Sequence, residues 1–460
     1  MGVETKASSP PASMFSLLDT DLYKLTMQCA VLKYFPSADV TYAFTNRTSN
    51  MLFTRDAFNW LRGEIIKLEE IVLSEDELNF LKKECPYLGP VYLDFLSKFR
   101  LHPRDQVDIS FFPEENDRDL GKVVMTIRGS WVDTILYEIP LLALTSEAYF
   151  KFCDKDWNHD GQEEKAYQKG VELLKGGCVF SEFGSRRRRD YHTHDTVMKG
   201  LCRAAKEGED KGWPGKFLGT SNVHFAMKYG VTPIGTVAHE WYMGIAAITN
   251  NYEGATELGL RYWVGSFGEG VLGIALTDTF GTPAFLKAFN MPIPRYTSSV
   301  TGPQNALPSA PNTTESAIDS LADTTRPPPE APIAEQGQTT DKTYAQVFGG
   351  VRQDSGDPKE YVNILKDYYA SIGIKEKKQI VFSDSLNIER CFEYKKIAED
   401  AGFNPSFGVG TFMTNDFQRL SDGNKSVPLN IVIKISSAGG RPAVKLSDNL
   451  GKNTGDHHCH

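Results

Sequence analysis

Seven short apolar runs in the middle of the chain each end on a glycine or a small polar residue, followed by a charged or hydroxyl side chain. The runs begin at Cys178, Phe217, Pro233, Gly273, Gly349, Ile380 and Phe407. Runs of about four to six apolar residues are typical of buried strands, and segments of helical length separate most of them. This alternation predicts βα units, a fold in which reactive side chains gather where strands end. We therefore expect an enzyme.

Composition and charge exclude several broad classes. The chain has 460 residues, enough for two domains, and 40% of them are hydrophobic, which is ordinary for a globular protein. The formal net charge of −9 argues against a nucleic-acid partner or an anionic membrane surface, so an anion site needs a local cluster of cations. Seven cysteines without a C-x-x-C pair favour a reducing compartment. The polar N-terminus and the lack of a long apolar run predict a cytoplasmic protein, with the nucleus left open as a second compartment.

Changes in pattern divide the chain into modules. Helical and alternating segments before the seven runs predict a mixed α/β module. Seven strand ends are one short of an eight-stranded barrel, so we expect a closed but irregular (β/α) barrel. A stretch rich in Pro, Ser, Thr and Ala cannot bury enough apolar surface to become ordered. The expected ranges are a disordered N-terminus (1–13), the mixed module (14–140) joined by C-terminal strands (425–450), the barrel (141–424) with a disordered insertion (294–342), and a tail (451–460).

Two strand ends carry residues suited to a polyanion. In GGVRQDSGDP, Arg352 and Asp354 stand two residues apart, so both side chains can leave the same face of a strand. A cation beside a carboxylate suits a polyanion with a bound metal, and a surface ion pair is the plainer interpretation. FGVGT places Gly408, Gly410 and Thr411 where backbone amides and a hydroxyl can hold a phosphate, although such turns often only reverse the chain.

Other strand ends add titratable and charged groups. IVFSDS ends on Ser383 and Asp384, at a neighbouring strand end. The run 186–189 consists of four arginines, and we expect at least one of them to face a ligand and the others to be solvated. His239, at the start of a helix and beside a carboxylate, suits a nucleophile or general base that works near neutral pH.

Two other histidine groups have plainer interpretations. His192 and His194 look like a metal-binding pair, but they follow their strand by several residues, so we expect them mostly at the surface. The terminal HHCH cluster is expected to be a frayed tail.

Taken in order, the motifs resemble a known family. The segments that carry the resemblance lie between Phe15 and Asp456 and read LLDTDLYKLTM, YAFTNR, SEFGSRRRR, GTSNVHFA, GTVAHEW, VRQDSGDP, FGVGT and AVKLSDNLGKNTGD. On these motifs the chain resembles the nicotinate phosphoribosyltransferases of the fungal type. The resemblance implies an irregular α/β barrel of the type II phosphoribosyltransferase kind with an N-terminal mixed α/β module beside it, in agreement with the pattern of strands and helices.

The resemblance also implies a reaction and its partners. Nicotinate and phosphoribosyl pyrophosphate (PRPP) would give nicotinate mononucleotide and pyrophosphate, the entry step of NAD salvage. ATP would be a co-substrate and Mg²⁺ a cofactor. No nucleic acid and no membrane are expected as partners. A homodimer is left open, in which Asp21 and Tyr23 would be offered across a subunit boundary.

Individual residues acquire roles through the resemblance. The catalytic residues would be His239, Asp278 and Arg186, and His239 matches the histidine that ATP phosphorylates transiently. Arg186, together with Mg²⁺, would stabilise the departing diphosphate. The residues matched to nicotinate binding are Tyr23, Phe183, Thr236 and Arg352.

The remaining matched residues concern PRPP. Asp354 and Asp384, with Asp278, would hold Mg²⁺, its waters or ribose hydroxyls, but no metal ligand is assigned among them. The residues matched to the phosphates and ribose of PRPP are Asp354, Ser383, Asp384, Gly408, Gly410 and Thr411.

Three alternatives stay open. The base could be nicotinamide or quinolinate; related enzymes for nicotinamide carry an acid near the GTSN motif, where Ser221 and Asn222 stand here. A second hypothesis is a barrel that has lost catalysis and serves as a nucleotide sensor. The third hypothesis is a metal-dependent hydrolase. Product formation from nicotinate and from nicotinamide, each with and without ATP, separates these hypotheses.

Overall fold

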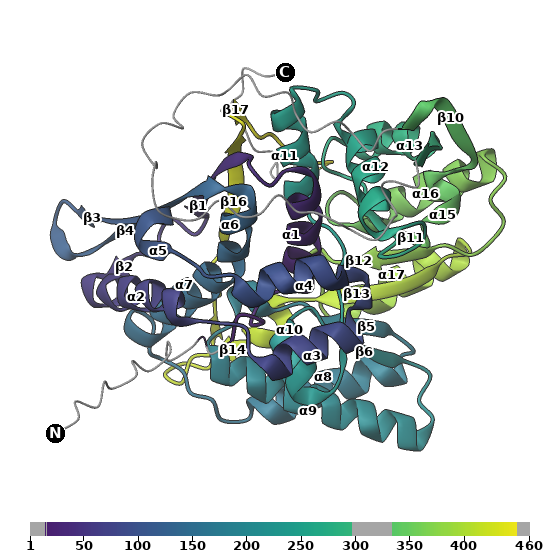
Figure 1. Ribbon diagram of the computed structural model, residues 1–460. Helices are drawn as coiled ribbons and strands as arrows, with labels where there is room; N and C mark the ends of the chain where they lie inside the picture. The colour runs from purple at the N-terminus through teal and green to yellow at the C-terminus, as the bar shows by residue number, and fades with distance from the viewer. Residues whose placement is uncertain (1–13, 15, 297–333, 449–460) are drawn as a thin grey trace, which may run out of the picture.

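Two β-sheets organise the chain, one in each of two adjoining modules (Figure 1). The structure is a computed structural model that describes residues 14, 16–296 and 334–448. The expected disordered N-terminus (1–13), the centre of the expected insertion (297–333) and the tail (451–460) lie outside these residues. The mixed α/β architecture confirms the expected fold class.

The sheet of the N-terminal module is antiparallel. Its strands are β1 (Asp39–Asn46), β2 (Phe53–Thr54), β3 (Val107–Glu114), β4 (Asp117–Ser130), β16 (Ile431–Ala438) and β17 (Arg441–Pro442). They follow the order β17-β16-β1-β4-β2, and β3 also pairs with β4. β1 alternates as the sequence suggests, because Val40, Tyr42 and Phe44 are buried on one face.

In the described part of the chain, seven helices belong to this module. They are α1 (Leu22–Tyr34), α2 (Arg55–Lys67), α3 (Glu75–Glu84), α4 (Gly89–Lys98), α5 (Pro103–Gln106), α6 (Trp131–Thr134) and α7 (Glu138–Phe152). Of these, α2, α5, α6 and α7 pack against the sheet of the module. α3 begins with a capping box, in which Ser74 and Glu77 each bind the other's backbone N–H. Short 3₁₀ turns complete the module at Leu68–Glu70, Pro86–Leu88 and Ile135–Tyr137.

All seven apolar runs form strands of one parallel sheet. The strands are β5 (Val179–Glu182), β6 (Lys216–Thr220), β7 (Thr232–Pro233), β8 (Ile274–Leu276), β11 (Gly350–Gln353), β12 (Gln379–Phe382) and β13 (Asn404–Val409). Their order is β7-β6-β5-β13-β12-β11-β8. Ile380, Phe382 and Phe407 are almost completely buried, as expected for a sheet covered on both faces.

The sheet differs from the closed barrel that the strand count suggests. Within the described ranges, β7 and β8 each have a strand neighbour on one side only, so the sheet is an open, curled half-barrel. These two edge strands are also very short. The chain passes from one edge to the other through two helices instead of a pairing strand.

Helices and short turns connect the barrel strands. They are α8 (Gln162–Lys175), a 3₁₀ turn (Ser185–Arg187), α9 (Tyr191–Lys211), α10 (Val223–Tyr229), α11 (His239–Thr249), α12 (Ala255–Phe267), α13 (Thr282–Phe289), α15 (Tyr344–Val347), α16 (Pro358–Ser371), α17 (Ile388–Asp400) and α18 (Thr411–Thr414).

Strands occupy both described ends of the range 294–342, where a disordered insertion is expected. β9 (Pro292–Tyr296) and β10 (Ala334–Thr343) form a two-stranded antiparallel sheet. Thr339 pairs with Pro294 and Thr343 pairs with Pro292.

The expected module boundaries do not coincide with the ends of secondary-structure elements. α7 (Glu138–Phe152) runs through the boundary placed between residues 140 and 141. In the range 425–450, β16 pairs with β1 of the N-terminal sheet. The first two residues of that range instead form β15 (Lys425–Ser426), which pairs with β14 (Phe417–Gln418).

An aromatic cluster joins the two modules. Trp131 follows β4, and its ring centroid lies 6.0 Å from that of Trp241 in α11. Phe35, at the end of α1, lies 5.9 Å from Trp131 and 6.0 Å from Trp241. All three rings are buried, so the modules share one core.

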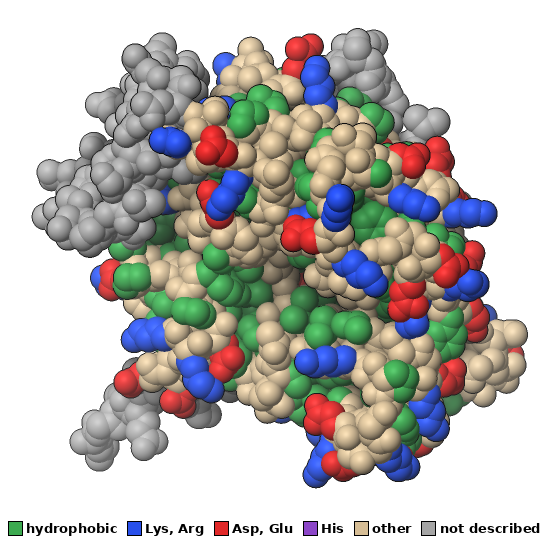
Figure 2. Space-filling view, turned by 90° about the vertical axis from the view of Figure 1, so that its right-hand side faces the viewer, with side chains coloured by type: hydrophobic (Ala, Val, Ile, Leu, Met, Phe, Trp, Pro, Cys, Tyr) green, Lys and Arg blue, Asp and Glu red, His purple; other side chains and the backbone are tan. Residues whose placement is uncertain are grey.

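On the face in Figure 2, charged side chains of both signs are interspersed around a central hollow with apolar side chains. Among the described residues, no helix combines the length and the apolar character that a membrane span requires.

Candidate active site

The carboxyl ends of the barrel strands meet along one edge of the sheet. β8, β11, β12, β13 and β5 are consecutive parallel neighbours. Residues that are distant in sequence therefore come together at this edge. The predicted site residues at or just after these strand ends are Phe183, Arg186, Asp278, Arg352, Asp354, Ser383, Asp384, Gly408, Gly410 and Thr411.

His239 is the first residue of α11 and reaches this edge from the loop after β7. Its Nδ1 lies 2.9 Å from Thr279 Oγ1, and its Nε2 lies 3.1 Å from Asp354 Oδ2. Burial lowers the pKa of His239, although the carboxylates of Asp278 and Asp354 oppose the shift. The imidazole is therefore mostly neutral near pH 7, which leaves one ring nitrogen with a free lone pair.

The carboxylates beside His239 fit a divalent cation. Ligand atoms of His239, Asp278 and Asp354 all lie within 4.8 Å of one another. Asp278 is fully buried, and its Oδ1 has no hydrogen-bond partner in the part of the chain that the structure describes. Its Oδ2 accepts a hydrogen bond from Ser355. Mg²⁺ prefers carboxylate oxygens and its own waters as ligands, so Asp278 and Asp354 suit it better than His239 does.

Lys445 completes this cluster and is a residue that sequence reasoning missed. Its Nζ lies 3.0 Å from His239 Nε2 and 4.0 Å from Asp278 Oδ2, and the side chain is almost fully buried. Burial favours the neutral form of Asp354, but the hydrogen bond with His239 and the positive charges of Arg352 and Lys445 hold the pKa of Asp354 well below its usual range. The available signal was a single lysine inside the apolar segment PAVKL.

Arg352 lies on β11, two residues before Asp354. The charge of Arg352 helps to lower the pKa of Asp354, which fits the expectation that the two side chains share a face. Arg352 Nε is buried, and no hydrogen-bond acceptor for it occurs among the described residues. A buried guanidinium N–H without an acceptor is costly, so the position suits an anionic ligand.

Phe183 explains one of the predicted phosphate-binding glycines. A Cβ added to Gly408 would lie 2.2 Å from the Phe183 ring, so the glycine makes room for that ring. A Cβ at Gly410 would lie 3.1 Å from the Phe183 carbonyl oxygen. Packing therefore accounts for Gly408 without a ligand, and its role toward phosphate stays a prediction. Thr411 begins α18, immediately after these glycines.

The other predicted phosphate and ribose ligands line the end of β12. Ser383 Oγ donates to Asp354 Oδ1 at 3.0 Å. Asp384 is half-buried and accepts a hydrogen bond from Ser385 at 3.2 Å. Ser385 has a positive φ of 50°, a conformation that is uncommon for a residue with a side chain.

Thr236 lies in the loop that leads to His239, and Tyr23 lies beside that loop. Tyr23 is buried in the first turn of α1, and a Cβ at Gly235 would lie 3.1 Å from its backbone nitrogen. The Thr236 carbonyl accepts a hydrogen bond from Thr26 at 2.6 Å. Asp21 Oδ1 accepts hydrogen bonds from Ser185 and Ser221 at 2.6 and 2.7 Å. A single chain thus places Asp21 and Tyr23 against its own barrel.

The arginine run is less solvated than expected. Arg186 has a side chain that is 49% exposed, and it lies 3.9 Å from Glu138. Arg187 is half-buried, whereas Arg188 and Arg189 are buried. The expectation of solvated neighbours is therefore wrong for Arg188 and Arg189.

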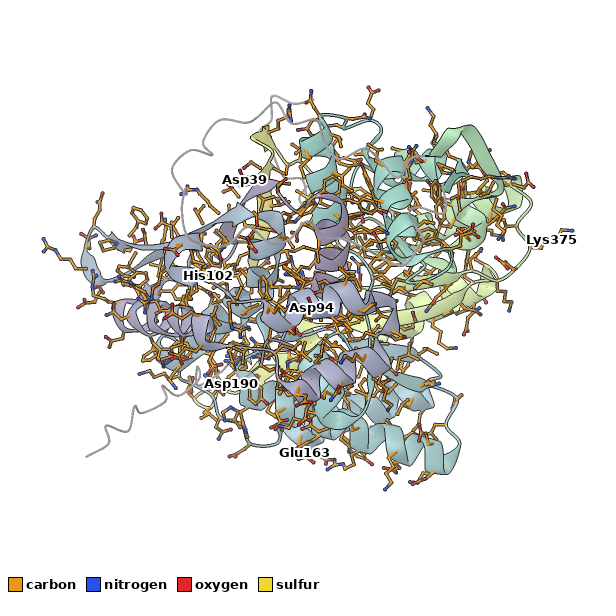
Figure 3. The ribbon with its side chains drawn as sticks, viewed as in Figure 1. Asp39, Asp94, His102, Glu163, Asp190 and Lys375 are labelled. Atoms are coloured by element: carbon orange, nitrogen blue, oxygen red, sulfur yellow. The ribbon has the colours of Figure 1, made fainter. Side chains whose placement is uncertain are left out.

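Distant partners explain the burial of these two arginines. Arg188 forms two hydrogen bonds of 2.8 Å to the carboxylate of Asp19. Arg189 packs against the rings of Phe150 and Phe417, with its Cζ 3.6 and 4.1 Å from their centroids. Asp190, labelled in Figure 3, ends the loop and caps α9.

His194 also corrects a surface prediction. It is fully buried, and its Nε2 lies 2.8 Å from Glu182 Oε2. Glu182 accepts further hydrogen bonds from Thr220 and from the backbone of Gly184, so the pair supports the loop after β5. His192 is exposed, as expected.

Cations from the N-terminal sheet add to the charge at this edge. Lys434 lies on β16, and burial, then the charges of Arg47 and Lys445, lower its pKa to about 8. Burial, then Arg186 and Arg47, lower the pKa of Arg187 to about 10. Neighbouring cations thus add to the effect of burial on Lys434 and Arg187, and such a local concentration of positive charge suits a polyanionic ligand.

Comparison with known proteins identifies the family. Residues 18–146 match the model of the nicotinate phosphoribosyltransferase (NAPRTase) N-terminal domain, and residues 178–300 and 317–460 match the model of the nicotinate phosphoribosyltransferase (NAPRTase) family. The chain belongs to the nicotinate phosphoribosyltransferase family. The prediction of an enzyme and the resemblance to this family are confirmed.

Relatives match the chain over nearly its full length. The "Probable nicotinate phosphoribosyltransferase" of Schizosaccharomyces pombe is 45% identical, with 97% of this chain and 96% of the relative covered. The nicotinate phosphoribosyltransferase of Saccharomyces cerevisiae is 42% identical, with 96% and 92% covered.

Solved structures agree with the family fold. A crystal structure from Saccharomyces cerevisiae, 42% identical, has a TM-score of 0.83 and covers 98% of this chain and 96% of its own. The nicotinate phosphoribosyltransferase of Porphyromonas gingivalis, 31% identical, has a TM-score of 0.75, with 96% and 97% covered.

Proposed function

We propose that this protein is a nicotinate phosphoribosyltransferase in NAD salvage that transfers phosphoribosyl from PRPP to nicotinate, assisted by ATP through a transient phosphate on His239. The observation that carries the proposal is the buried His239 imidazole between two carboxylates and the Lys445 ammonium. A neutral nucleophile, oxygen ligands for a metal and a fixed cation are the groups that phosphoryl transfer to histidine requires.

ATP would react first at His239. A ring nitrogen attacks the γ-phosphorus; the N–P bond forms while the P–O bond to ADP breaks, and ADP leaves with that electron pair. Lys445, 3.0 Å from Nε2, would face the oxygens of the transferred group. Asp278 and Asp354 would hold Mg²⁺, which supplies positive charge to phosphate oxygens when it is bound. Water later cleaves the N–P bond and releases inorganic phosphate.

Phosphoribosyl transfer would follow at the same edge. The bond from ribose C1 to the diphosphate oxygen breaks while the nicotinate ring nitrogen bonds to C1, giving nicotinate mononucleotide and pyrophosphate. Arg186, Lys434 and Arg47 would stabilise the charge that develops on the diphosphate. Gly410 and Thr411, with Ser383 and Asp384 in the next loop, would hold the 5′-phosphate and ribose. Gly408 would act chiefly through Phe183.

Nicotinate recognition would depend on Arg352. Its buried Nε, for which the described residues offer no acceptor, matches a carboxylate, and nicotinamide has no charge to offer there. Tyr23 and Phe183 would enclose the pyridine ring, and Thr236 would contact it from the loop before His239.

Incubation with γ-labelled ATP and Mg²⁺ tests the phosphohistidine. The wild-type protein should acquire an acid-labile, base-stable label, and His239→Asn should abolish it. Full labelling of that variant would reject the assignment. In parallel, nicotinate should yield a mononucleotide in an ATP-stimulated reaction and nicotinamide should not. Neither base reacting would favour a nucleotide sensor, and tightly bound zinc in the purified protein would favour a hydrolase.

A further inference from the structure

A fully buried lysine connects two parts of the site that are remote in sequence. Lys24 lies in the first turn of α1 and is 0% exposed. Its Nζ forms an ion pair with Glu240 and another, of 2.6 Å, with Glu138 Oε2. The rings of Tyr23 and Tyr42 each lie 5.8 Å from the ammonium. A buried lysine requires carboxylate partners of this kind. The need for such partners does not by itself explain why Glu138 and Glu240 also lie beside residues of the candidate site.

Each carboxylate lies beside a different residue of the candidate site, one in sequence and one in space. Glu240 directly follows His239 in α11, and its Oε1 accepts a hydrogen bond of 2.8 Å from Trp131. Glu138 Oε1 lies 3.9 Å from Arg186 Nη1. Lys24 therefore links Glu240, which follows His239 in sequence, to Glu138, which lies beside Arg186.

The distances show how Glu138 is divided. It binds Lys24 at 2.6 Å and Arg186 only at 3.9 Å. Arg186 is half exposed, so it has room to move toward a ligand, whereas Lys24 has none. Without the lysine charge, Glu138 would bind Arg186 more closely and would compete with any anion for that guanidinium.

We propose that Lys24 is a positioning residue that draws Glu138 away from Arg186, keeps Arg186 available to the diphosphate of PRPP, and fixes Glu240 so that His239 is held toward Asp354. The assignment rests on the proposed function, because it takes PRPP as the ligand of Arg186. In this proposal, one lysine controls the position of His239, which would receive phosphate from ATP, and the availability of Arg186, which would contact the leaving diphosphate.

Substitutions of Lys24 and of Glu138 should have different effects on PRPP binding. Lys24→Met should raise the dissociation constant for PRPP, measured by calorimetry with Mg²⁺, by about fivefold, since Glu138 then competes for a partly exposed Arg186. Glu138→Gln should leave the constant unchanged or lower it, because it removes the competitor. The double variant should return to within about twofold of the wild-type constant.

A merely structural role predicts a different pattern. If Lys24 only supported the fold, both single variants would weaken PRPP binding and the double variant would be worse still; that pattern would overturn the proposal. Should Lys24→Met fail to fold, a weakened PRPP affinity in folded Glu138→Gln is by itself sufficient to reject it. Lys33→Met is the matched control, because this lysine lies on the same helix and donates to the Gly265 carbonyl at 2.8 Å. It should leave PRPP affinity unchanged.

The part of the proposal that concerns Glu240 and His239 is tested by the rate of phosphate labelling. Glu240→Gln should slow phosphate labelling of His239 and leave PRPP affinity unchanged, and an unaltered labelling rate would remove this half of the proposal. Loss of labelling and product formation in the wild-type protein would instead reject the proposed function. Normal wild-type activity with the wrong pattern among the variants would reject only the role of Lys24.

Discussion

His239 owes its chemistry to side chains that the sequence keeps far away. Thr279 binds its Nδ1, while Asp354 and Lys445 meet at its Nε2. Burial keeps the ring mostly neutral, and Lys445 supplies a positive charge where a transferred phosphoryl group would carry negative charge. The histidine alone is a weak indication of function, and its neighbours make it specific.

Removing the Lys445 charge should therefore slow phosphate transfer to His239. We expect Lys445→Met to reduce the rate of labelling from γ-labelled ATP by roughly 100-fold, comparable to loss of one preorganised charge-stabilising donor. Lys445→Arg should recover part of the rate. Rapid-quench labelling measures the effect, and a methionine variant that labels at the wild-type rate would show that Lys445 does not face the phosphoryl group.

Arg352 should control the choice of base. Arg352→Ala should raise the KM for nicotinate by roughly 10- to 100-fold, as expected for losing a charge-assisted hydrogen bond, with a smaller effect on the KM for PRPP. Arg352→Lys should recover little, because an ammonium cannot reproduce the paired N–H geometry. Steady-state kinetics with each substrate varied separately provide the check; an unchanged KM for nicotinate in the alanine variant would contradict the role.

Sequence reasoning reached some of these side chains and missed others for a physical reason. His239, Arg352 and Asp354 stand at the ends of apolar runs, so their position is visible locally. Lys445 reaches His239 only because β16 and the segment after it return to the barrel. The burial of Arg188 depends on Asp19 in the same way, since its partner lies 169 positions away.

The local residue pattern predicted the strands of the barrel sheet well, but it did not predict whether the sheet closes. Every apolar run became a parallel strand, because four or so consecutive buried residues leave little alternative in a βα repeat. Closure of the sheet depends on whether its two edge strands can reach each other. With β7 only two residues long and β8 only three, the pattern of residues carried no information on that point.

The contact between β13 and the loop after β5 should be sensitive to volume. Gly408→Ala should displace the Phe183 ring, which lies 2.2 Å from the added Cβ, and should cost about 1–3 kcal/mol of stability. The KM for nicotinate should also rise if Phe183 covers the base. Gly63→Ala in α2 is the control, because no atom of the described residues lies within 4 Å of its added Cβ. Thermal unfolding and kinetics together test the contact; an unperturbed Tm for Gly408→Ala would contradict it.

In the whole molecule, a buried ion pair joins the segment before α1 to the barrel. Asp19 precedes α1, and Arg188 follows β5, yet the two are buried against each other. Burial favours the neutral carboxyl, but the charge and hydrogen bonds of Arg188 outweigh it and keep the pKa of Asp19 below its ordinary value of 3.8. A depressed folded-state pKa means that the ionised pair stabilises the protein above that ordinary value.

Asp19→Asn should therefore destabilise the protein in a pH-dependent way. Near pH 7 we expect a loss of about 3–5 kcal/mol, because Arg188 is left buried without its counter-charge. The difference between wild type and variant should shrink as the pH falls below 3.8 and through the lower folded-state pKa, where Asp19 itself becomes protonated. Unfolding followed across this range gives the result, and a difference that grows toward acid would contradict the sign of the shift.

The place of β16 has a consequence for biosynthesis. β16 pairs with β1 along almost its whole length, although about 385 residues separate the two strands. A nascent polypeptide on the ribosome must leave one side of β1 without its strand partner until residues 431–438 have been translated. Lys434 lies on β16 and Lys445 follows it, so these two cations join Arg186 and Arg352 at the edge of the barrel only after β16 has been synthesised.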